Sequence, residues 1–146
     1  MSDREASLSG IEQLRHMLAA DAQPPIGRTL GISLVEIEEG RAVFEGVPDA
    51  RSLNPLGTIH GGYAATLLDS ACGIATHSRL APGQTYTTLE LKVAYHRAMT
   101  PETGKVRAIG TVLSFGRRVA FAEARILDAQ DRLIASATST LPVISQ

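Results

Sequence analysis

The sequence predicts an α+β domain in which a curved antiparallel β-sheet wraps around one long central helix. Gly61–Arg79 is apolar on nearly every side, which is typical of a buried helix. Four β-rich stretches follow this helix, and short turns suited to hairpins separate the later ones. One stretch also carries a small apolar face, which lets a sheet approach a single helix closely. That face consists of Ala120, Ala122, Ala124 and Ile126.

Composition limits the chain to one soluble domain. Its 146 residues fall within the size range of a single domain, and 44% of them are hydrophobic. The 14 Lys and Arg nearly balance the 15 Asp and Glu, which disfavours a general nucleic-acid partner. The N-terminus lacks the pattern of a signal peptide, and no apolar stretch is long enough to span a membrane. We therefore expect a cytoplasmic protein with neither nucleic acid nor membrane as a partner.

The first 26 residues are expected to form a helical extension to a main domain at residues 27–146. A helix is predicted over Ser9–Ala20, because Ser9 and Glu12 have the spacing of a capping box. The run Gln23-Pro24-Pro25 is expected to break this helix and lead into an extended region.

The remaining elements are predicted from β-forming residues and turn signals. Gly31–Val47 is expected to form two strands joined at Glu39-Gly40, and Asp49–Thr58 is expected to form a loop. The strands after the central helix are predicted at Thr85–Arg97, Lys105–Phe115, Val119–Asp128 and Leu133–Val143.

Asp69 interrupts the apolar pattern of the central helix. A buried carboxylate is destabilising unless it is paired, hydrogen-bonded or open to water. Helical spacing places small residues around it, which leaves room for a ligand on that face. Three of these, Gly62, Thr66 and Gly73, are candidate substrate-binding residues. The alternative is a structural aspartate at an exposed helix edge or bonded to nearby backbone.

A polar, glycine-rich loop leads directly into the start of the same helix. It runs from Asn54 to Gly62 and includes His60-Gly61-Gly62. The first N–H groups of a helix lack intrahelical acceptors, and such donors stabilise a developing oxyanion. The alternative is a tight loop-to-helix junction with no ligand. The carboxylate two turns further along favours the functional interpretation.

Other chemistries have little support. The chain has no Gly-x-Ser-x-Gly elbow, phosphate-binding loop or dinucleotide fingerprint. Its four histidines lack the spacing of a helical metal pair, so no metal site is expected. Cys72 is the only cysteine, which excludes an intrachain disulfide, and we expect it to be a buried hydrophobe rather than a nucleophile.

The order of these motifs resembles the phenylacetate-degradation-type hotdog-fold acyl-CoA thioesterases. The resemblance covers Gly27 to Pro142 and rests on three segments. These are the Asn–His–Gly–Gly–Asp pattern of Asn54, His60, Gly61, Gly62 and Asp69, the stretch Thr87–Tyr95, and the hairpin Phe115–Phe121.

The resemblance implies a hotdog fold whose chains pair their sheets into a dimer, often stacked into a tetramer, with active sites shared between subunits. The implied activity is hydrolysis of an acyl-CoA thioester without a metal or organic cofactor. The Gly61 N–H would polarise the thioester carbonyl. Asp69 of the other subunit would act as nucleophile or general base.

The same resemblance assigns supporting roles to further residues. Asn54 would position water or substrate, and His60 would support the loop and the carbonyl end. Thr88, rather than Thr87, would lie near the acid and hold the attacking water. Arg117 and Arg118 would meet the phosphates of coenzyme A, although the pair also fits a solvated turn.

Two other functions remain possible at this point. A hotdog hydratase or dehydratase would pair a histidine with an acid, and a non-catalytic acyl-CoA sensor would need no acid at position 69. The glycines after His60 and the presence of Asp69 favour a thioesterase. Because aromatic residues are scarce we expect a modest pocket, but aryl, short-chain and medium-chain acyl groups all fit the sequence.

Overall fold

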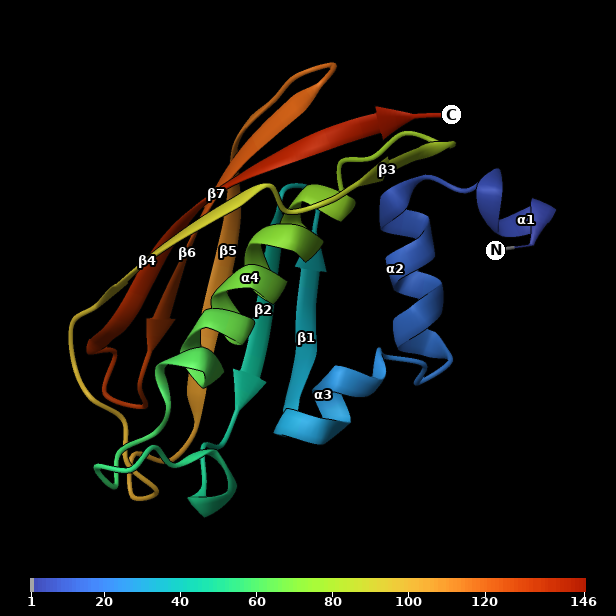
Figure 1. Ribbon diagram of the computed structural model, residues 1–146. Helices are drawn as coiled ribbons and strands as arrows, with labels where there is room; N and C mark the ends of the chain where they lie inside the picture. Colours follow the sequence, from blue (N-terminus) through green and yellow to red (C-terminus); the bar gives the residue numbers. More distant parts are fainter. Residues whose placement is uncertain (1) are drawn as a thin grey trace.

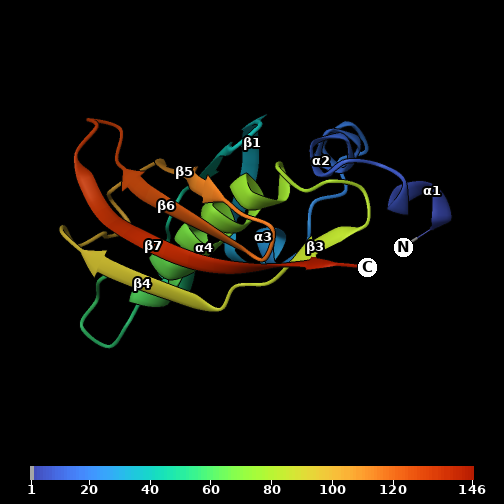
Figure 2. The same cartoon turned by 90° about the horizontal axis from the view of Figure 1, so that it is seen from above.

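The computed structural model describes residues 2–146 and confirms the predicted α+β class: a curled antiparallel sheet with the long helix α4 lying in its concave face (Figures 1 and 2). The helices are α1 (Asp3–Ala6), α2 (Gly10–Ala19), α3 (Pro25–Leu30) and α4 (Gly61–His77), with a 3-10 turn at Ala50–Ser52. The strands are β1 (Ile32–Glu38), β2 (Arg41–Gly46), β3 (Gln84–Tyr86), β4 (Glu90–Tyr95), β5 (Val106–Phe115), β6 (Val119–Leu127) and β7 (Leu133–Ser145).

The strands follow the order β1-β2-β5-β6-β7-β3, and β4 pairs with β7 beside β3. All pairs are antiparallel. Within residues 2–146, β1 pairs only with β2 and β4 only with β7, so these two strands lie at opposite edges of the sheet. The prediction of one strand over Thr85–Arg97 is wrong, because residues 87–89 interrupt it between β3 and β4. Pro142 of β7 lies opposite this break and has no N–H to donate to the ladder.

The N-terminal helix is confirmed, and its N-cap Ser9 makes both hydrogen bonds of the capping box with Glu12. The expectation of an extended region after it is wrong, because α3 begins at Pro25. Proline suits the first position of a helix, where its missing N–H has no intrahelical role. Helix α3 ends at Leu30, and its C-cap Gly31 has a φ of 67°, the left-handed conformation that glycine adopts easily.

The core lies between α4 and the concave face of the sheet. Leu67, Leu68 and Ala71 of α4 are fully buried, and three of the four residues of the predicted small face of β6 share their cluster: Ala122, Ala124 and Ile126. The fourth, Ala120, is buried with Leu80 and Val143 instead. Gly110 of β5 lies so close to the Ala71 carbonyl that a side chain there would clash. Each buried leucine contributes about 1.5–3 kcal/mol through removal from water.

One face of α4 departs from the prediction of burial on nearly every side. The residues along this face are half-buried or exposed: Gly61, Gly62, Ala65, Thr66, Asp69 and Ser70. It includes Gly62 and Thr66 of the small-residue strip predicted around Asp69, whereas Gly73 of that strip is buried.

The N-terminal segment packs onto the rest of the domain. Ile11 and Leu14 of α2 are buried, and the Gly10 N–H donates to the Leu80 carbonyl at 2.9 Å, just beyond the end of α4. Figure 1 shows α2 beside the C-terminal half of α4 and α3 at the start of β1. No helix within residues 2–146 has the length and apolarity needed to cross a bilayer.

Candidate active site

The loop before α4 is held by its own side chains. The Asn54 side-chain oxygen accepts the N–H groups of Leu56 and Thr58 at 2.9 and 3.2 Å, and its amide donates to the Thr58 hydroxyl at 2.8 Å. These bonds fix the loop ahead of the helix. In this chain Asn54 therefore shapes the turn, and it does not line the hollow described next.

His60 is the N-cap of α4, and its ring is fixed by the helix itself. The Gly62 N–H donates to His60 Nδ1 at 2.8 Å, so the neutral ring carries its proton on Nε2. The backbone N–H of His60 in turn donates to the Ser52 carbonyl at 2.7 Å. The histidine thus presents an outward N–H donor at the start of the helix.

A hollow of about 520 Å³ lies at this end of α4, lined by His60, Gly61 and Gly62 together with Tyr95 and Arg97. The Tyr95 hydroxyl donates to the Gly61 carbonyl at 2.7 Å and holds the turn against the edge strand β4. The Gly61 N–H donates to no acceptor within residues 2–146, as expected for the first residue of a helix. This end of the helix can therefore supply backbone donors to an oxyanion.

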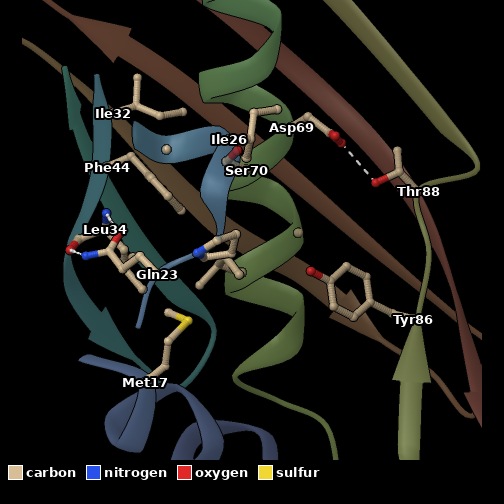
Figure 3. A pocket seen from close by; sticks show the side chains of 14 residues that line it. Met17, Gln23, Ile26, Ile32, Leu34, Phe44, Asp69, Ser70, Tyr86 and Thr88 are labelled. Carbon is tan, nitrogen blue, oxygen red and sulfur yellow. Dashed lines mark hydrogen bonds between the residues drawn. The ribbon is translucent and has the colours of Figure 1, made fainter. Parts of the chain in front are cut away.

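Asp69 lies two turns further along α4, on the half-exposed face. The Thr88 hydroxyl, from the segment between β3 and β4, donates to Asp69 Oδ1 at 2.9 Å (Figure 3). Thr88, and not Thr87, is thus the hydroxyl beside the acid. Because the hydrogen bond occupies one carboxylate oxygen, it orients the side chain and leaves the second oxygen for chemistry.

A separate cavity of about 190 Å³ adjoins this carboxylate (Figure 3). Its walls are mainly apolar: Met17, Pro24, Ile26, Gly27, Ile32, Leu34, Phe44, Gly73 and Ile74, with Gln23, Asp69, Ser70, Tyr86 and Thr88 as the polar members. Burial raises the pKa of Tyr86 to about 12, and the nearby Asp69 charge adds to this shift. Tyr86 is therefore a neutral phenol at physiological pH.

The Gly61 N–H and the Asp69 carboxylate of one chain are too far apart to act on the same atom. Gly61 and Asp69 are eight residues apart on α4, which corresponds to about 12 Å along a helix that rises 1.5 Å per residue. A reacting carbon must lie about 3 Å from both the oxyanion donors and the nucleophile. One chain therefore provides both kinds of group but not one complete centre.

The other predicted site residues are spread along the helix and beyond it. Gly73 lines the cavity beside Asp69, whereas the Thr66 hydroxyl donates to the Gly62 carbonyl at 2.9 Å. Arg117 and Arg118 are exposed on the β5–β6 turn, where the Val143 N–H donates to the Arg118 carbonyl. This turn lies beyond the C-terminal end of α4 (Figure 1). It is at the opposite end of the helix from His60-Gly61-Gly62, here called the glycine turn.

Cys72 is fully buried, and burial raises the pKa of its thiol to about 12. A buried thiol with a raised pKa carries little thiolate at neutral pH, which agrees with the expectation that Cys72 is a buried hydrophobe. Among the described residues, no three histidine, cysteine or acidic side chains are grouped so that they could hold a metal ion.

Sequence reasoning missed most of the residues that line the two hollows, and three of these bear polar groups that matter for the site. Arg97 lines the hollow at the glycine turn, while Tyr86 and Gln23 line the cavity beside Asp69. A signal existed only for Arg97, a cation at the end of a predicted strand. Gln23 and Tyr86 reach the cavity through tertiary packing alone, which no local pattern reports.

Comparisons with known proteins identify the family of this chain. Residues 56–135 match the family model described as the thioesterase superfamily. The chain is 30% identical to the proofreading thioesterase EntH of Klebsiella pneumoniae, over 79% of this chain and 82% of that protein. It is 28% identical to the 1,4-dihydroxy-2-naphthoyl-CoA hydrolase of Listeria monocytogenes, over 79% and 92%. A solved variant of the phenylacetic acid degradation protein PaaI from Thermus thermophilus is also 28% identical, with a TM-score of 0.74 over 82% of this chain and 98% of that one.

Proposed function

This chain belongs to the thioesterase superfamily, and on that premise we propose that it hydrolyses an acyl-coenzyme A thioester to the free acid and coenzyme A. Its fold is the hotdog fold, and it is a thioester hydrolase. The observation that carries the finer assignment is Asp69, a half-buried carboxylate oriented by Thr88 at an apolar cavity that can hold an acyl group. The name of the Listeria relative, a CoA-thioester hydrolase, supports coenzyme A as the leaving group.

In the proposed reaction the Gly61 N–H donates to the thioester carbonyl oxygen, and the fixed His60 Nε2–H faces the same hollow. These donors stabilise the negative charge that develops on that oxygen in the transition state. The hydrogen bond from Thr88 keeps one Asp69 oxygen in place while the other oxygen reacts.

Asp69 can act in two ways, and both balance chemically. As a general base it takes a proton from water while the water oxygen adds to the carbonyl carbon; the C–S bond then breaks and the thiolate is protonated. As a nucleophile its carboxylate displaces the thiolate to form a mixed anhydride, which water then hydrolyses to the acid and free Asp69. Label found in Asp69 after a single turnover in ¹⁸O-labelled water identifies the anhydride path with water attack on the aspartyl carbon, because general-base hydrolysis places the label only in the free acid.

The helix arithmetic supports a site shared between two chains. With about 12 Å between Gly61 and Asp69 in one chain, a partner has to bring its own Asp69 to the first chain's glycine turn. The outer edge of β4 carries the unpaired backbone groups through which two sheets can join. We therefore expect a homodimer, or a tetramer of two dimers, as the active form.

The phosphates of coenzyme A need positive charge at the rim of the site. Arg117 and Arg118 on their exposed turn are the proposed contacts. Arg97 lines the hollow at the other end of α4 and is a separate candidate contact there. Arginine forks match phosphate oxygens in two parallel hydrogen bonds. Such exposed contacts add affinity for the nucleotide end and do not assist bond cleavage.

A panel of acyl-CoA thioesters with a thiol-detecting reagent tests the proposed function. Release of free coenzyme A at enzymatic turnover supports it, whereas binding without turnover favours an acyl-CoA sensor. Formation or loss of a double bond with the thioester intact favours a hydratase. Either of these two results would overturn the proposal.

Mixing two inactive variants tests the shared site. Asp69→Asn lacks the acid, and Gly61→Val crowds the glycine turn, where an added Cβ already lies 2.9 Å from the Tyr95 hydroxyl. Hybrids of the two contain one site with both defects and one intact site. Co-expression should therefore restore activity that neither variant has alone. A well-folded monomer in sedimentation, or no restoration in verified hybrids, would contradict the shared site.

A further inference from the structure

The cavity beside Asp69 is closed on one side by a segment outside the sheet-and-helix core. Residues 20–27, here called the wall segment, comprise the link between α2 and α3 and the first three residues of α3, and they supply Pro24, Ile26 and Gly27 to the lining. The wall segment is weakly packed: α3 buries none of its residues, and Ile26 is 52% exposed although it also faces the cavity. Apolar packing alone therefore does not fix its position.

Gln23 attaches the wall segment to the sheet. Its side-chain oxygen accepts the Leu34 N–H at 2.8 Å, and its side-chain amide donates to the Leu34 carbonyl at 3.2 Å (Figure 3). Leu34 belongs to the edge strand β1 and lies where the β1–β2 register shifts. The glutamine amide thus takes the place of a neighbouring strand at that residue.

The same residue links the attachment to the cavity. The Leu34 side chain lines the cavity, as do those of Ile32 in the same strand and Phe44, its partner in β2. Gln23 therefore fixes the separation between the wall segment and the apolar strands opposite. That separation is one dimension of the space available to an acyl group.

We propose that the wall segment sets the size of acyl group this enzyme accepts, and that Gln23 is the positioning residue that holds it. This inference rests on the proposed function, because it treats the cavity as the acyl-binding part of the thioesterase site. A cavity of about 150 Å³ holds one benzene molecule. The cavity of about 190 Å³ therefore suits an acyl group with the bulk of one ring or a comparable aliphatic chain. Bicyclic and long-chain acyl groups exceed it.

Acyl preference across a size series tests the role of Gln23. Gln23→Met keeps the length of the side chain and removes both hydrogen bonds to Leu34. With the wall released, kcat/KM for hexanoyl-CoA and benzoyl-CoA should fall roughly tenfold, chiefly through KM, the scale for losing two hydrogen bonds. Turnover of dodecanoyl-CoA or naphthoyl-CoA should not fall, so the preference for small acyl groups narrows by about the same factor.

Two further variants keep the test decisive if Gln23→Met folds poorly. Ile26→Ala widens the cavity at a residue that is largely exposed, and it should shift the preference in the same direction. Gly73→Ala narrows the cavity from the α4 side, since its Cβ would lie 3.1 Å from the Tyr86 hydroxyl, and should sharpen the preference for small groups.

Gln130→Met is the matched control. Gln130 accepts a hydrogen bond from Arg132 in the β6–β7 turn, does not line the cavity, and should leave the acyl profile unchanged. A uniform fall across all acyl sizes, or an unchanged profile, in folded Gln23→Met would overturn the inference while thioester hydrolysis by the native chain stands. Absence of hydrolysis by the native chain would instead overturn the proposed function and, with it, this inference.

Discussion

The two hollows along α4 differ in how they are built. The hollow at the glycine turn is wide and open, and it offers N–H donors from the backbone and from the His60 ring. Hydrogen bonds made by the loop's own side chains hold these donors in place. The cavity beside Asp69 is smaller and mainly apolar, and its one carboxylate is oriented by a hydroxyl from a distant segment. One hollow is suited to stabilising charge, the other to binding hydrocarbon next to a base or nucleophile.

This difference shows why one helix can serve both halves of a reaction without containing a complete site. Any helix start offers backbone N–H donors, because the first N–H groups lack intrahelical acceptors. The carboxylate needs a helix face that stays accessible, and small residues provide it two turns later. Pairing two copies of the chain can bring the halves together. The predictions below test each half separately.

The largest effect is expected at the carboxylate. Asp69→Asn retains the shape of the side chain and the acceptor for Thr88 but removes the group that activates water or attacks the thioester. Steady-state kinetics should show kcat lowered by about 100-fold or more, the scale for losing a positioned acid or base, with KM little changed. Asp131→Asn is the control, since Asp131 is an exposed turn residue with a φ of 60° that asparagine tolerates. Near-full turnover by Asp69→Asn would exclude the proposed mechanism.

A smaller effect is expected at the glycine turn. In Gly61→Ala the new Cβ would lie 2.9 Å from the Tyr95 hydroxyl and 3.1 Å from its Cζ, so the donors and Tyr95 have to move apart. We expect kcat/KM to fall roughly tenfold, because oxyanion donors act only at short range. Tyr95→Phe makes room, so the double variant should lose less than the sum of the two single losses. Simple additivity in this double-mutant cycle would show that crowding at Tyr95 is not the cause.

The fold was largely predictable from the sequence, because its strongest signals are local. The apolar pattern located α4 to within two residues at its C-terminus, and the small face of β6 indicated the close approach of the sheet. The errors have local causes as well. Pro25 fits the pattern of a helix breaker but occupies the first position of α3, and Pro142 lies opposite the break in the expected strand.

The site was only half predictable. Asp69 and the glycine turn stand out because each breaks or follows a helical pattern, and the contact of Thr88 with Asp69 agrees with the family resemblance. The wall segment could not be found this way. Gln23 reaches Leu34 across 11 residues through a tertiary contact, and nothing in a Gln-Pro-Pro run indicates a partner in a strand.

A modest effect is expected at the nucleotide end of the substrate. Arg117→Ala combined with Arg118→Ala should raise KM for CoA thioesters several-fold and leave kcat nearly constant, the result of losing binding shared by ground and transition states. The loss should shrink at high salt and against a pantetheine thioester, which lacks the nucleotide phosphates. Arg4→Ala combined with Arg15→Ala, at two exposed positions, controls for the same change in net charge. Equal losses with both thioesters would show that Arg117 and Arg118 do not contact the nucleotide phosphates.

The smallest effect is expected at the C-terminal end of α4, in stability rather than rate. Burial lowers the pKa of His77, whose Nε2 lies 2.8 Å from the Gln13 side-chain oxygen and whose ring packs edge-on to Tyr86 at 5.6 Å. The unfolded chain therefore binds a proton at a higher pH than the folded chain does. Stability from the neutral histidine is complete above the unfolded pKa of about 6.5 and declines as pH falls through the folded value. Urea unfolding at pH 7, 6 and 5 should show a steeper decline for the native chain than for His77→Gln. Parallel declines would mean that His77 does not contribute to acid sensitivity.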